Sequence, residues 1–157
     1  MSSTSPSVPC DLVTAHAESA FRFLTDDELE IICPYLQIRR WPSDSVLMRE
    51  GEPGDFMGFL VEGKLAVRKE TSFAGKHILL AILEPGTMVG EISVVAHEQR
   101  NASVVATEES TLLELTSESF DLLVKEHPVL GVKFLSQIVS VVSLRLRKAD
   151  DRLARLL

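Results

Sequence analysis

Cysteine is scarce in this chain, and the hallmarks of exported and membrane proteins are missing. Cys10 and Cys33 are the only cysteines among 157 residues, too few for a disulfide framework or for the ligand set of a structural zinc site. No apolar run approaches the roughly 20 residues that cross a bilayer. The N-terminus lacks the basic and apolar regions of a signal peptide. We therefore expect a protein of the reducing cytoplasm with no membrane partner.

Basic residues are fewer than acidic ones, with 16 Lys and Arg against 23 Asp and Glu. The formal net charge is −7 at pH 7, whereas a surface that coats nucleic acid usually carries a clustered basic face. We therefore expect that the chain does not bind DNA by itself.

Catalytic and metal-binding patterns are missing as well. The histidines show no metal-ligand spacing, and the serines lack the histidine and aspartate pattern that activates a nucleophile. The four histidines are His16, His77, His97 and His127. We expect neither an enzyme nor a bound metal or cofactor.

The length and composition predict one globular domain. With 45% hydrophobic and 25% charged residues, the chain is ordinary for a soluble domain and long enough for a single core. Residues 1–15 are predicted to be a flexible tail because the first ten are rich in Ser, Thr and Pro. Residues 16–157 are predicted to form the domain. Its first helix is expected to begin at Thr25, since Thr25 and Glu28 have the spacing of a capping box.

Residues 37–115 consist of short apolar runs separated by turn residues. Gly and Pro punctuate them at intervals of roughly 8–12 residues, as in a β-sandwich or barrel. The runs are QIRRW, SVLMRE, FMGFLVE, KLAVRK, HILLAIL, ASVVAT and TLLEL. We predict a mainly β fold with flanking helices (α+β), in the form of a jelly-roll-like β-barrel with an N-terminal helix and a long C-terminal helix.

The C-terminal helix is predicted over residues 129–157. Before it, Thr116 or Ser117 can cap a shorter helix that stops near Pro128. Apolar residues of the long helix alternate steps of three and four, which is the heptad seam of a coiled coil. The seam residues are Val132, Leu135, Val139, Val142, Leu146, Ala149, Leu153 and Leu156. This pattern predicts a homodimer; the alternative is a helix that packs one stripe on its own barrel.

The segment Val89–Val104 combines groups suited to a phosphate and a neighbouring sugar. Gly90 permits close backbone approach, and a helical turn from Glu91 would aim free amides at an anion. Arg100 supplies a planar fork for phosphate oxygens, and Glu91 accepts from hydroxyl donors. Asn101 and Ala102 can add unobstructed amides. Taken alone, Glu91 and Arg100 can equally be an ordinary surface ion pair.

The order of several motifs resembles the cyclic nucleotide-binding domain family. Its phosphate cassette, roughly F-G-E-[LIV]-A-L, a loop and P-R-x-A-[TS]-V, is similar to VGEISV and QRNASV here. The turn REGEPGD, the strand and turn FLVEG and the segment LEPG match the family motifs that precede the cassette. The resemblance covers about 135 residues.

The departures from the family pattern affect specificity most at Asn101. Val89 and Gln99 replace an aromatic residue and a proline, and Ser93 replaces a small apolar residue. Asn101 stands where the family often has Ala, Ser or Thr, and the hydroxyl of a Ser or Thr at this position can touch the phosphate or a guanine. Asn can still donate a hydrogen bond, so cAMP and cGMP both stay open as the ligand.

The resemblance implies a sensor of cAMP or cGMP that acts in signal transduction through a movable C-terminal helix and a separate effector protein. It places Arg145 where the C-terminal helix of relatives contacts the purine. The implied ligand-binding residues are Gly90, Glu91, Ile92, Ser93, Arg100, Asn101, Ala102, Ser103 and Arg145. The alternative is a degenerate, ligand-free domain that serves as a constitutive dimeric interaction protein.

Overall fold

The computed structural model describes residues 10–157, without the side chains of residues 12, 17 and 18. The helices are α1 (Cys10–Ala15), α2 (Ala17–Ala20), α3 (Asp26–Ile32), the 3-10 helix η1 (Cys33–Tyr35), α4 (Glu91–Ala96), α5 (Ser117–Glu126) and α6 (Pro128–Leu156). The strands are β1 (Gln37–Trp41), β2 (Val46–Met48), β3 (Phe56–Glu62), β4 (Leu65–Glu70), β5 (His77–Leu83), β6 (Met88–Val89), β7 (Ser103–Ala106) and β8 (Ser110–Thr116). The predicted mainly β fold with flanking helices is confirmed.

The strands form two antiparallel sheets in a jelly-roll order. One sheet has the order β1-β8-β3-β6 and the other β2-β7-β4-β5. Within residues 10–157 no ladder joins the sheets, so the predicted jelly-roll-like β-barrel consists of two facing sheets that are not closed into one. Turns lead the chain from one sheet to the other, and side chains rather than hydrogen bonds fill the space between them.

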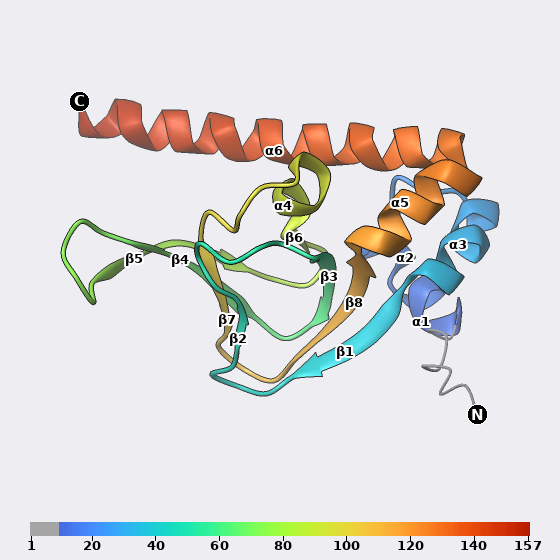
Figure 1. Cartoon of the computed structure of the whole chain (residues 1–157), viewed down its shortest axis with the longest axis horizontal. Helices are drawn as coiled ribbons and strands as arrows, with labels where there is room; N and C mark the ends of the chain where they lie inside the picture. The colour runs from blue at the N-terminus through green and yellow to red at the C-terminus, as the bar shows by residue number, and fades with distance from the viewer. Residues whose placement is uncertain (1–9) are drawn as a thin grey trace.

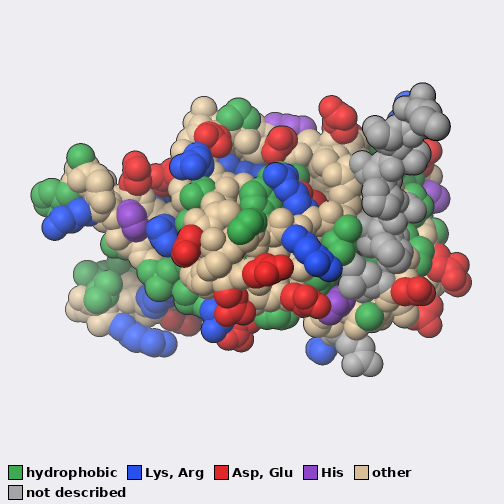
Figure 2. Space-filling view, turned by 90° about the horizontal axis from the view of Figure 1, so that it is seen from below, with side chains coloured by type: hydrophobic (Ala, Val, Ile, Leu, Met, Phe, Trp, Pro, Cys, Tyr) green, Lys and Arg blue, Asp and Glu red, His purple; other side chains and the backbone are tan. Residues whose placement is uncertain are grey.

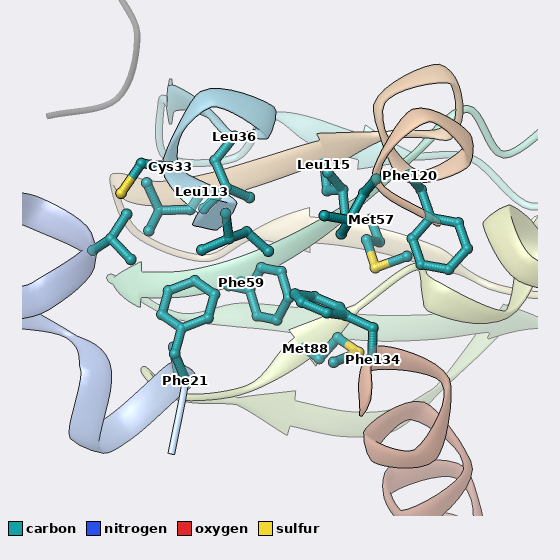
Figure 3. Packing of buried hydrophobic residues seen from close by; sticks show 14 of the residues in the cluster. Phe21, Cys33, Leu36, Met57, Phe59, Met88, Leu113, Leu115, Phe120 and Phe134 are labelled. Atoms are coloured by element: carbon teal, nitrogen blue, oxygen red, sulfur yellow. The ribbon is translucent and has the colours of Figure 1, made fainter. Parts of the chain in front are cut away.

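The sheet β1-β8-β3-β6 separates two hydrophobic clusters, because successive side chains of a strand point to opposite faces. Leu113 and Leu115 of β8 pack with the helices, whereas Leu112 packs between the sheets. Figure 3 shows the helical side, where Phe59 of β3 lies between Phe21 and Phe134. The ring centroids of Phe59 are 4.7 Å from Phe21 and 6.2 Å from Phe134. These aromatic contacts join the N-terminal segment, the sheet and α6 in one core.

Helix α3 begins where the sequence predicts. Thr25 accepts a hydrogen bond from the amide of Glu28, and the Glu28 carboxylate accepts one from the amide of Thr25. The Glu28 carboxylate also pairs with Lys133 of α6 at 2.5 Å. The hydrogen bond from Lys133 lowers the pKa of Glu28. Glu28 therefore both caps α3 and holds the start of α6 through Lys133.

The structure describes only the last six residues of the predicted tail, and these are helical. Residues 1–9 of that tail lie outside the described residues, but residues 10–15 form α1. Val13 of α1 is fully buried in the helical core. Cys10 and Cys33 form a disulfide with a Cα–Cα distance of 5.6 Å, so the two cysteines do have a structural role that their number did not indicate.

Helix α6 runs along the whole molecule, with α4 directly beneath it (Figure 1). Near its start, Leu130, Phe134 and Ile138 are buried. By length and composition it can cross a membrane, with a mean hydropathy of 1.6 in its most apolar window, of which 22% is buried. This finding is contrary to the expectation that no apolar run of the chain approaches that length. Leu130, Phe134 and Ile138 place one face of the first half of α6 in the hydrophobic core.

Charged side chains are mixed on the face seen from below in Figure 2. Acidic and basic residues alternate there with tan polar surface. The acidic residues behind the net charge of −7 therefore do not form one continuous acidic patch on this face.

Candidate functional site

The candidate site begins at Gly90, where β6 turns into α4. Gly90 has φ +77°, in the left-handed region that side chains disfavour. A Cβ there would lie 2.6 Å from the Cε of Met48 and 2.7 Å from Nη1 of Arg100. Only glycine allows this turn to approach the Arg100 side chain so closely.

The turn between β2 and β3 packs against α4 just as closely. A Cβ at Gly54 would lie 2.1 Å from the Cβ of Ser93, which itself is buried in α4. The backbones are joined as well: the amide of Gly51 donates to the carbonyl of Arg100, and the amide of Arg100 donates to that of Glu52, each at 2.8 Å. The first glycine turn and the cassette thus form one rigid unit.

Arg100 lies inside this unit with 5% of its surface exposed. Its Nη1 donates to the carbonyl of Gly90 at 2.9 Å, and its Nη2 donates to the carbonyl of Phe56 at 2.6 Å. The guanidinium carbon lies 5.2 Å from the centre of the Phe56 ring, within the range of a cation–π contact. These contacts fix the guanidinium while leaving it with further donors for an anion.

Arg100 is a buried cation with three carboxylates near it. Burial lowers the pKa of Arg100, while the negative charges of Asp55, Glu91 and Glu114 oppose that shift. Burial likewise raises the pKa of Glu114, although Trp41 donates a hydrogen bond to its carboxylate at 2.9 Å. The guanidinium is the group of this site that can attract a phosphate, because charge-assisted hydrogen bonds are strong where water is excluded.

Glu91 lies beside Arg100 at the start of α4, with 1% of its surface exposed. Its partner is Arg145 of α6, whose Nη1 donates to the Glu91 carboxylate. The Nη2 of Arg145 donates to the carbonyl of Met88. In the described part of the chain Glu91 and Arg100 form no ion pair with each other. The surface-pair interpretation of Glu91 and Arg100 is therefore wrong.

The loop after Arg100 consists of Asn101 and Ala102 and leads into β7 at Ser103. Asn101 is exposed, while Ala102 and Ser103 are half-buried. The Ser103 hydroxyl accepts a hydrogen bond from the amide of Glu50 at 2.9 Å. Ser103 therefore holds the loop onto the β2–β3 turn.

The structure brings most of the predicted site residues together. Gly90, Glu91, Arg100 and Arg145 are linked by contacts, whereas Ile92 faces outward and is 38% exposed. Sequence reasoning missed Phe56 and Met88, which take part through their carbonyls. Side-chain patterns carry no signal for such backbone acceptors. Chemically, the site offers a buried cation and a buried carboxylate side by side, suited to an anion joined to a hydroxyl.

Comparison with known families gives one match over the centre of the chain. The model of the family described as cyclic nucleotide-binding domain matches residues 38–127. The chain is 29% identical over 130 residues to the cyclic AMP receptor protein of Thermus thermophilus, covering 83% of this chain and 58% of that protein. It is 34% identical over 99 residues to a cyclic nucleotide-gated potassium channel of Mesorhizobium japonicum, covering 63% of this chain and 26% of the channel. The chain thus spans little more than half, or less, of these relatives.

Solved structures show the same fold. A cyclic nucleotide-binding domain from Methylobacillus flagellatus superposes with a TM-score of 0.88 at 23% identity, covering 98% of this chain and 89% of that one. The catabolite activator protein of Thermus thermophilus gives a TM-score of 0.71 at 29% identity, covering 85% of this chain and 60% of that one.

Proposed function

Because this chain belongs to the cyclic nucleotide-binding domain family, we propose that it is a sensor of cAMP or cGMP that signals to a separate partner through α6. The observation that supports this proposal most is that Arg100 is hydrogen-bonded directly beside Glu91. The guanidinium of Arg100 bonds to the carbonyl of the residue that directly precedes the buried Glu91 carboxylate. In a cyclic nucleotide the negatively charged phosphate lies next to a ribose hydroxyl, so the phosphate can pair with Arg100 while the hydroxyl donates to Glu91.

Helix α6 provides the output in this proposal. It is fixed to the core at its start by Phe134 and Lys133, and to the site at its middle by Arg145. A ribose hydroxyl that donates to Glu91 competes for the carboxylate that Arg145 now contacts. Since a ligand shifts an equilibrium only through different affinity for two states, a change at this contact gives the nucleotide a route to move α6.

Dimerisation through the seam of α6 is the second part of the proposal. Its support is that several seam residues are exposed, including Val132 at 62%, Val139 at 67% and Leu146 at 61%. Leu135 and Val142, by contrast, pack partly on the core of their own chain. Some seam residues therefore pack on their own chain, and the exposed ones are available to pack against a second copy.

A contact of Arg145 with the purine base is predicted and can be separated from its contact with Glu91. Arg145→Ala is expected to weaken binding of the preferred cyclic nucleotide by about 1–2 kcal/mol, the scale of a hydrogen bond from a charged group. It should leave the affinity for ribose 3′,5′-cyclic phosphate, which lacks the base, almost unchanged. Calorimetric titration of both ligands measures the difference. Equal changes for the two ligands, or none, would show that Arg145 does not contact the base.

One observation favours the ligand-free alternative. Arg145 donates a hydrogen bond to Glu91, and the carbonyls of Gly90 and Phe56 accept hydrogen bonds from Arg100, so these buried charges already have partners within the chain. Such a site can persist in a constitutive dimeric interaction protein. Titration with cAMP and cGMP distinguishes the two functions, because only the sensor releases or absorbs heat in a saturable manner.

A further inference from the structure

Lys69 of β4 contacts the cassette from the strand that pairs with β7. Its Nζ donates to the carbonyl of Asn101 at 2.6 Å and to the carboxylate of Glu50 at 2.7 Å. Strand β4 pairs with β7 up to Arg68 opposite Ser103. Lys69 therefore lies directly beside the loop that precedes β7.

The contact with Asn101 fixes the direction of the next amide. A peptide group is planar and trans, so its N–H points away from its C=O. Because Lys69 holds the carbonyl of Asn101 toward β4, the amide of Ala102 is directed to the other side. The preceding peptide is held in the same manner, since the carbonyl of Arg100 accepts from the amide of Gly51.

These two peptides leave two donors available. Within residues 10–157, the amides of Asn101 and Ala102 donate to no backbone or side-chain acceptor. They follow Arg100 directly, where an anion would approach the guanidinium. A carbonyl at either position would repel that anion.

We propose that Lys69 is a positioning residue of the phosphate site, which keeps the amide of Ala102 turned toward the cyclic phosphate without touching the ligand. This inference rests on the proposed function. Glu50 supports it from the other side: the hydrogen bond from Lys69 lowers the pKa of Glu50, so the carboxylate stays ionised and holds the ammonium above Asn101. The amide of Glu50 also bonds to the Ser103 hydroxyl, which fixes the far end of the loop.

The test compares Lys69→Met with Lys69→Arg and with Lys76→Met. Methionine keeps the length of the chain but donates nothing, whereas arginine can still donate to a carbonyl and a carboxylate. Lys76 is exposed in the β4–β5 turn and controls for the loss of one positive charge. We expect Lys69→Met to bind the preferred cyclic nucleotide about ten-fold more weakly, the scale of one lost charge-assisted hydrogen bond. Lys69→Arg should stay within about three-fold of the wild type, and Lys76→Met should be unchanged.

Amide signals in NMR spectra of the ligand-free proteins give a second measurement. The signal of Ala102 should shift in Lys69→Met and return in Lys69→Arg, because the peptide turns when its carbonyl is released. Unchanged affinity in Lys69→Met, equal losses in Lys69→Met and Lys76→Met, or an unmoved Ala102 signal would each overturn the inference. If the wild type binds no cyclic nucleotide, the proposed function fails, while the Ala102 signal still decides whether Lys69 orients this peptide.

Discussion

Arg100→Ala is expected to weaken cyclic nucleotide binding by about 2–5 kcal/mol, because it strands a buried phosphate without its cation. That range is about 30-fold to several thousand-fold in the dissociation constant. Arg100 is 5% exposed, and its guanidinium donates to two carbonyls, so water cannot readily replace it. Isothermal titration calorimetry measures the change. Glu91→Ala should lose less, because it removes hydrogen bonds to a neutral hydroxyl rather than a charge pair.

The fold of the variant must be checked, since Arg100 also bonds to the carbonyls of Gly90 and Phe56. Losing both donors is expected to cost about 1–3 kcal/mol for each buried acceptor that finds no water. Arg100→Lys keeps the charge but not the fork, and serves as a second variant with a smaller structural change. If Arg100→Ala melts cooperatively and binds as tightly as the wild type, the assignment of the phosphate site fails.

Leu146→Glu is expected to convert a dimer into monomers. A two-fold axis along the α6 seam would bring the two new carboxylates together in an apolar interface, where like charges are strongly unfavourable. Leu146 is 61% exposed in the single chain, so the fold itself should tolerate the change. Sedimentation velocity at tens of micromolar measures the outcome.

Leu122→Glu is the matched control for this variant. Leu122 lies on α5, outside the seam, and is 48% exposed. It introduces the same charge and should leave the dimer intact. A wild-type protein that sediments as a monomer under these conditions would contradict the proposed dimer, whatever the variants do.

The strands and helix caps were predictable because their signals are local. The capping box of Thr25 and Glu28 needs only four consecutive residues, and β1 was predicted at its observed bounds from the run QIRRW. Strand β6 was missed because Met88 and Val89 form a strand only by pairing with β3. Helix α1 was missed for the same reason, since its anchor is the burial of Val13 in a distant core.

In the candidate site, too, the residues within one local motif were predictable and the long-range contacts were not. Gly90, Glu91 and Arg100 were found because they share one short motif with a known family. The ion pair between Arg145 and Glu91 joins residues 54 positions apart, and the hydrogen bond from Lys69 to Asn101 joins residues 32 apart. No sequence period encodes such distances, so these contacts required the folded structure.

Calorimetric titration of the wild-type protein with cAMP and with cGMP tests the central claim most directly. The account predicts saturable binding of at least one of them, with one nucleotide for each chain, and much weaker binding of a linear nucleoside monophosphate. A folded protein that shows no saturable binding of either cyclic nucleotide up to millimolar concentration would contradict it.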